Sequence, residues 1–66
     1  MSKYEYVDVE LSQWKELVRQ QYSDVKIYAL PEEEGGVREA YVGNKFVGDW
    51  DGGGEIAGRI LKLQVV

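Results

Sequence analysis

The chain has 66 residues, with twelve Asp or Glu against eight Lys or Arg, a formal net charge of −4 and neither His nor Cys. Without imidazole or thiol, it has no side chain that ordinarily titrates near neutral pH, no soft metal ligand and no thiolate nucleophile. An acidic chain is also a poor match for DNA, RNA and anionic lipid, which attract clustered Lys and Arg. We therefore expect a binding protein and not an enzyme, with no metal or cofactor, no direct nucleic-acid binding and a basic partner.

The length predicts one small domain over residues 1–66, near the lower limit at which a chain folds unaided and burying about 60% of its unfolded surface. Disulfides and structural zinc are excluded by composition, so an aromatic core or self-association must supply stability. Two Trp, five Tyr and one Phe favour the core, and we expect a monomer. No apolar run is long enough to span a bilayer, and the start MSKYEYVDVE does not resemble a secretion signal. We expect no membrane association and a cytoplasmic location.

The first part of the chain predicts a strand, a helix and a second strand. Residues 3–11 alternate between apolar side chains on one side and tyrosines and acids on the other, which is typical of a half-buried strand. Apolar side chains then recur at helical spacing over residues 12–22, with Ser12 as the expected N-cap. A second strand is expected over residues 25–30, where Pro31 ends it. This order favours a right-handed parallel crossover.

The middle of the chain predicts a loop followed by a β-hairpin. Residues 31–36 combine Pro, three Glu and two Gly, which favours a solvated turn. Gly43-Asn44 separates residues 37–42 from residues 45–50, and both turn residues tolerate the positive φ of a two-residue hairpin turn. The expected cross-strand pairs are Tyr41 with Phe46 and Val37 with Trp50 on one face, and Arg38 with Asp49 and Ala40 with Val47 on the other. We expect the aromatic face to be the core face.

Residues 54–66 fit two structures. An apolar stripe at helical spacing predicts a helix, formed by Ile56, Ala57, Ile60 and Leu61. Gly58 would weaken that helix by about 1 kcal/mol relative to Ala, and alternation of Leu61, Leu63 and Val65 also fits a strand. With a helix here, the fold is α+β in the order β-α-β-β-β-α, a four-stranded mixed sheet with two helices on one face. The expected core is Trp14, Leu17, Tyr41, Phe46, Ile56 and Ile60.

Three features could carry chemistry, and the residues around them argue against each. Gly52-Gly53-Gly54 before a helix could cradle a phosphate, but no Lys-Ser or Lys-Thr follows, and acids flank it. Asp49, Asp51 and Glu55 could chelate a hard cation, but their spacing lacks a full calcium loop. Two acids could flank a bond to be hydrolysed, but no pair stands out and so small a domain has difficulty enclosing a pocket.

The outer side of the first strand is the best candidate for a binding surface. Aromatic side chains alternate with acids there; tyrosine supplies contact area at low entropy cost, and carboxylates pair with Arg or Lys. The same pattern fits an ordinary solvated face with Tyr chosen for its strand propensity, and either the acids or the tyrosines could make the contact. The candidate binding residues are Tyr4, Tyr6, Asp8, Glu10, Tyr28, Glu32, Glu33, Glu34, Asp49 and Asp51.

The run AYVGNKFVGDWDGGGEIAGRI resembles the last hairpin and terminal helix of thioredoxin-fold proteins of the glutaredoxin type, over about a third of the chain. That family has a similar short turn and a glycine after the second strand. This chain lacks the family's Cys motif and has no Pro immediately before the hairpin, so redox chemistry and the thiol-binding cleft are not carried over. The resemblance implies only the architecture, and with it a degenerate domain retained for binding.

In size and charge the chain is similar to short acidic phage-encoded inhibitors, including anti-CRISPR proteins, without sharing a motif. Many members of that group block a host complex by placing carboxylates in a basic nucleic-acid groove. The resemblance implies an inhibitor of a host nucleic-acid-handling complex that acts in the host cytoplasm, because carboxylates can meet the Lys and Arg that normally meet phosphates. The alternatives are a non-catalytic adaptor or subunit and the thioredoxin-like binding domain.

Overall fold

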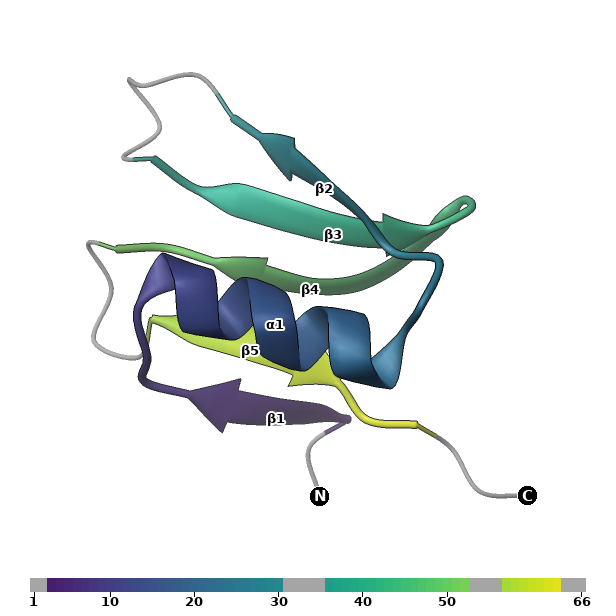
Figure 1. Ribbon diagram of the computed structural model, residues 1–66, viewed down its shortest axis with the longest axis horizontal. Helices are drawn as coiled ribbons and strands as arrows, with labels where there is room; N and C mark the ends of the chain where they lie inside the picture. The colour runs from purple at the N-terminus through teal and green to yellow at the C-terminus, as the bar shows by residue number, and fades with distance from the viewer. Residues whose placement is uncertain (1–2, 31–35, 53–56, 64–66) are drawn as a thin grey trace.

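The computed structural model describes residues 3–30, 36–52 and 57–63, which form one antiparallel sheet and one helix (Figure 1). The elements are β1 (Tyr4–Val7), α1 (Leu11–Gln21), β2 (Lys26–Ala29), β3 (Arg38–Val42), β4 (Lys45–Trp50) and β5 (Gly58–Leu61). The five-stranded sheet has the order β1-β5-β4-β3-β2, and every neighbouring pair is antiparallel. The predicted four-stranded mixed sheet with two helices is therefore wrong.

Helix α1 crosses one face of the sheet and joins its two edge strands (Figure 1). Trp14 and Val18 lie one helical turn apart and are fully buried against the sheet, as apolar spacing of four residues requires. The helix begins at Leu11 with Glu10 in the N-cap position, so the predicted Ser12 cap is wrong. β1 and β2 run in the same direction but lie at opposite edges, so the predicted crossover does not join neighbouring strands.

Strand β5 occupies the position where the sequence also predicted a helix. It lies between β1 and β4 and pairs with both, which satisfies its backbone on two sides. Gly58 is buried, and a Cβ atom there would lie 2.7 Å from Cδ1 of Trp14 and 3.2 Å from Cδ1 of Trp50. Since only glycine lets both indole rings approach this strand, the residue that weakened the helix prediction is the one that the sheet requires.

The β3–β4 hairpin confirms the turn prediction and corrects the register beyond it. Val42 pairs with Lys45 and Tyr41 with Phe46 around Gly43-Asn44, where Gly43 alone takes a positive φ, of 61°. An irregularity between Ala40 and Tyr41 then shifts the register by one residue. The observed pairs are Ala40 with Gly48, Glu39 with Asp49 and Arg38 with Trp50, so the predicted partners of Ala40, Arg38 and Val37 are wrong.

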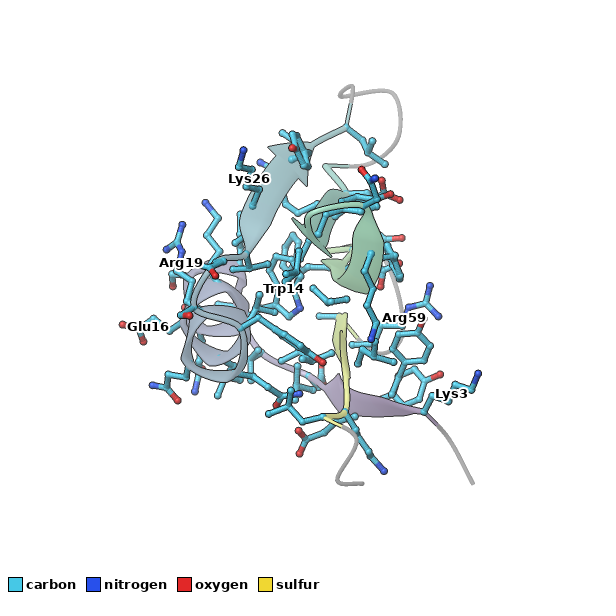
Figure 2. All side chains as sticks on the ribbon, turned by 90° about the vertical axis from the view of Figure 1, so that its right-hand side faces the viewer. Lys3, Trp14, Glu16, Arg19, Lys26 and Arg59 are labelled. Carbon is cyan, nitrogen blue, oxygen red and sulfur yellow. The ribbon has the colours of Figure 1, made fainter. Side chains whose placement is uncertain are left out.

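This register shift separates the hairpin's aromatic residues onto opposite faces of the sheet. Trp50 lies on the α1 side, where its Nε1 donates to the Val9 carbonyl oxygen at 2.9 Å. Tyr41 and Phe46 lie on the other side with Arg59, which Figure 2 shows on the face opposite α1. Strict alternation would have placed Phe46 and Trp50 on one face, and the extra residue between them reverses that.

The buried core consists of Trp14, Val18, Ala40, Val47, Ile60 and Leu61, with Trp14 and Val18 supplied by α1 and the others by the sheet. Trp14 and Ile60 confirm the prediction, whereas Leu17 is only partly buried at the margin. Tyr41 and Phe46 are outside this buried core, so their predicted place is wrong, and Ile56 lies outside the described residues. Nε1 of Trp14 donates to the Arg59 carbonyl oxygen at 3.3 Å, so the buried indole keeps a hydrogen-bond partner.

Candidate functional site: the open sheet face

The face of the sheet opposite α1, on which Arg59 lies in Figure 2, is here called the open face. It carries a continuous line of aromatic rings. We call this line the aromatic row; it consists of Tyr28 on β2, Tyr41 on β3, Phe46 on β4 and Tyr4 on β1. Successive ring centroids are 5.8, 5.6 and 6.3 Å apart, all in edge-to-face geometry. The four rings therefore form one continuous aromatic surface, although they come from four strands.

At one end of the row, a charged pair from two neighbouring strands lies against the rings. Arg59 on β5 donates to both carboxylate oxygens of Asp49 on β4, from Nε at 2.8 Å and from Nη2 at 3.2 Å. The guanidinium carbon is 4.6 Å from the centroid of the Tyr4 ring and 5.4 Å from that of Phe46. The hydrogen bond that Arg59 donates to Asp49 raises the pKa of Arg59 above the usual arginine value. We call these four residues the Arg59 cluster.

At the other end of the row, two tyrosines and an acid lie together on β2 and β3. The Tyr41 hydroxyl donates to Oε1 of Glu39 at 3.2 Å, and the Tyr28 ring, 51% exposed, lies against the Tyr41 ring. Partial burial, and then the hydrogen bond to Glu39, raise the pKa of Tyr41 above the usual tyrosine value. We call Glu39, Tyr28 and Tyr41 the Glu39 cluster.

Only part of the predicted binding set lies on this face. Tyr4, Tyr28 and Asp49 belong to it, and Tyr6 is 53% exposed and pairs with Arg59 in the β1–β5 register. Asp8 and Glu10 follow the end of β1, where the chain leaves the sheet toward α1, so the predicted run of tyrosines and acids along one strand is interrupted. Asp51 follows β4, where its backbone N–H bonds to the Ala57 carbonyl at 2.6 Å. Glu32, Glu33 and Glu34 lie outside the described residues.

Four residues of the open face were missed as binding residues by the sequence analysis: Glu39, Tyr41, Phe46 and Arg59. Glu39 and Tyr41 flank Ala40, the small residue that packs under α1, and this alternation was the available signal. Phe46 reaches the open face because of the register shift in the hairpin. Arg59 pairs with Asp49 because β5 is a strand, where the sequence favoured a helix. Neither could be found from local spacing.

The described ranges hold no group of three or more acidic side chains arranged to bind a metal ion. Arg59 binds both carboxylate oxygens of Asp49. Glu55, which with Asp49 and Asp51 formed the predicted cation ligands, lies outside those ranges. A shallow groove between α1 and β1 has one acid, Glu5, among mainly apolar and amide side chains.

In the described part of the chain, the 11-residue α1 is the one helix, and it is not long and apolar enough to cross a membrane.

Comparison of the chain with protein-family models, with curated proteins and with solved structures gave no match. The fold and the site themselves define the class: a five-stranded antiparallel sheet covered by a helix on one face and lined by tyrosines on the other. The thioredoxin-type architecture is not carried over, because β5 lies where that resemblance implied a terminal helix. What the protein does must therefore be argued from the open face.

Proposed function

We propose that this chain is a non-catalytic binding protein that docks onto a basic surface of a protein partner through the aromatic row. The observation that carries the proposal is the continuity of four partly exposed rings across the uncovered face of the sheet. Tyrosine is enriched in protein interfaces, because its ring offers a large, rigid contact area and its hydroxyl a hydrogen bond. A rigid sheet presents these rings without an ordering cost on binding.

The charge of the open face favours a basic partner. Two carboxylates lie on this face as cross-strand partners on β3 and β4, Glu39 bonded to Tyr41 and Asp49 bonded to Arg59. Aromatic ring faces also attract cations, and the chain as a whole carries a net charge of −4. These features complement Arg and Lys side chains and repel phosphate, which supports a protein partner over nucleic acid.

Within this class, we propose as the particular role that the chain inhibits a complex that handles nucleic acid, by covering its basic groove in the cytoplasm. Its acidity and small size support this role, because a basic groove built for phosphates also accepts carboxylates and aromatic rings. The contact surface now proposed is the aromatic row, with the acids as assisting charges, in place of the acid-rich strand expected from the sequence.

The test begins with a partner isolated by pull-down and then purified, so that binding can be measured directly. Replacing Tyr6 and Tyr28, both more than half exposed, with Ser should weaken binding at least ~10-fold, or about 1.4 kcal/mol, without unfolding the chain. A double change to Ser at Glu16 and Gln20, exposed on α1, is the control and should leave affinity within about 2-fold. An equal loss of affinity in the Tyr6 and Tyr28 variant and in the control variant would contradict docking through the open face.

A competition measurement separates inhibitor from adaptor. If the chain covers a nucleic-acid groove, it should displace a labelled oligonucleotide from the partner, with a midpoint set by the chain's own affinity. Raising the salt concentration should weaken the wild-type complex. Simultaneous binding of chain and oligonucleotide would exclude groove occupation, and would leave an adaptor or subunit that still uses the aromatic row.

A further inference from the structure

The two clusters of the open face share the same kinds of group, two aromatic rings and one carboxylate, but only the Arg59 cluster contains a cation. Each has two aromatic rings in edge-to-face contact and one carboxylate: Tyr4, Phe46 and Asp49 at one end, and Tyr28, Tyr41 and Glu39 at the other. The ring centroids are 6.3 Å apart at 65° in the first and 5.8 Å apart at 69° in the second. The protein thus presents one filled and one open version of a similar arrangement.

The Arg59 cluster shows how this face holds a guanidinium group. The carboxylate accepts two hydrogen bonds in fork geometry, at 2.8 and 3.2 Å, while the rings lie 4.6 and 5.4 Å from the guanidinium carbon. This geometry combines the two interactions for which a planar guanidinium is best suited, bidentate pairing with a carboxylate and stacking on aromatic faces.

In the Glu39 cluster, no cation of the described chain takes the corresponding place. Tyr41 engages one carboxylate oxygen of Glu39, and within the described ranges no Lys or Arg forms an ion pair with Glu39 or lies over either tyrosine ring. Arg38 is engaged elsewhere, with Nη1 donating to the Gly36 carbonyl at 2.7 Å. Lys26 is the cross-strand partner of Tyr41, and among the described residues it forms no ion pair with Glu39.

We propose that the Glu39 cluster is a receptor site for one arginine side chain of the docked partner. Tyr28 and Tyr41 would contact the guanidinium through their rings and Glu39 would accept its hydrogen bonds, as Tyr4, Phe46 and Asp49 do for Arg59. The proposal rests on the proposed docking function and names the partner group that the open face takes. Arginine is preferred to lysine because a compact, strongly hydrated ammonium cannot both stack and pair in a fork.

The site can be tested without the natural partner, by nuclear magnetic resonance titration of the full chain with short capped peptides. Tetra-arginine should shift the ring resonances of Tyr28 and Tyr41 in a saturable manner. Tetra-lysine should bind at least ~5-fold more weakly, and tetra-citrulline, which has nearly the same shape but no charge, should cause no saturable shift. Equal shifts with arginine and citrulline peptides would overturn the proposal.

A matched pair of acid-to-amide substitutions locates the site. Glu39→Gln should weaken tetra-arginine binding ~5-fold or more, whereas Glu16→Gln, the same change on the exposed side of α1, should leave it unchanged. Unchanged binding in Glu39→Gln, or shifts confined to the Arg59 cluster, would overturn the arginine site. The docking function is tested separately, by the affinity of the Tyr6 and Tyr28 variant for the purified partner.

Discussion

The two faces of the sheet both carry aromatic residues and use them for different purposes. On the α1 side, Trp14 and Trp50 each donate from the ring nitrogen to a backbone carbonyl, so their polar atoms are satisfied inside the fold. On the open face, Tyr28 is 51% exposed and the Tyr41 hydroxyl donates to the Glu39 side chain instead of to the backbone. Aromatic content therefore does not mark the core of this chain; coverage by α1 does.

Glycine placement sharpens the contrast between the faces. A Cβ atom on Gly48 would lie 2.4 Å from the backbone oxygen of Arg59, and one on Gly58 would lie against both indole rings. At both positions the packing leaves no room for an added carbon, against the β5 backbone at Gly48 and against the indole rings at Gly58. On the open face, by contrast, Tyr6 and Tyr28 are more than half exposed.

The largest expected effect is on the α1 side. Trp14→Ala should lower the free energy of unfolding by about 3–5 kcal/mol, because it empties the centre of the core, and a domain of this size has little more than that to lose. Urea denaturation followed by circular dichroism measures the loss. Tyr28→Ala is the control on the open face and should cost about 0.5 kcal/mol or less. Similar losses for the two would remove the distinction between the faces.

The two buried glycines should differ in cost. Gly48→Ala should destabilise by about 3 kcal/mol, because the added carbon meets the β5 backbone, whereas Gly58→Ala should cost about 1–2 kcal/mol, because it meets side chains that can shift. Chemical denaturation of both variants under the same conditions gives the comparison. A smaller loss for Gly48→Ala would contradict the close β4–β5 approach at that position.

Phe46 distinguishes the observed register from the predicted one. Phe46 is a half-buried residue of the aromatic row. Phe46→Ala should therefore lower the free energy of unfolding by about 1–2 kcal/mol, whereas loss of a core side chain would lower it by about 3–5 kcal/mol. The variant should remain folded at 25 °C and show a cooperative thermal transition. A loss equal to that of Trp14→Ala would return Phe46 to the core and contradict the register shift.

The smallest expected effect is a pH dependence on the open face. The folded state raises the pKa of Tyr41, so this group contributes stability that is fully present below about pH 10 and is lost as the pH rises through the folded-state pKa. Ring-carbon chemical shifts should show Tyr41 ionising later than a tyrosine in an unfolded peptide. Glu39→Gln should bring that midpoint closer to the ordinary value. An unchanged midpoint would mean that Glu39 does not act on Tyr41.

Local patterns in the sequence correctly predicted the elements whose contacts are close in the chain. The helix follows from the spacing of Trp14 and Val18, and the hairpin turn from Gly43-Asn44 with its first two cross-strand pairs. Each depends on interactions within a few residues, which periodicity and turn chemistry describe well. Tyr4, Tyr28 and Asp49 of the candidate site were found in the same way, from alternation along single strands.

The composition by itself determined that the chain is acidic, lacks His and Cys, and must rely on aromatic residues for packing or contact. Only the tertiary structure decided which aromatic residues pack against α1 and which lie on the open face. Insertion of β5 between β1 and β4 turned an ambiguous segment into a strand, and the register shift between Ala40 and Tyr41 put Phe46 and Trp50 on opposite faces. Pairing between segments distant in sequence depends on the whole sheet, because one residue of register reverses a face and no local spacing encodes that choice.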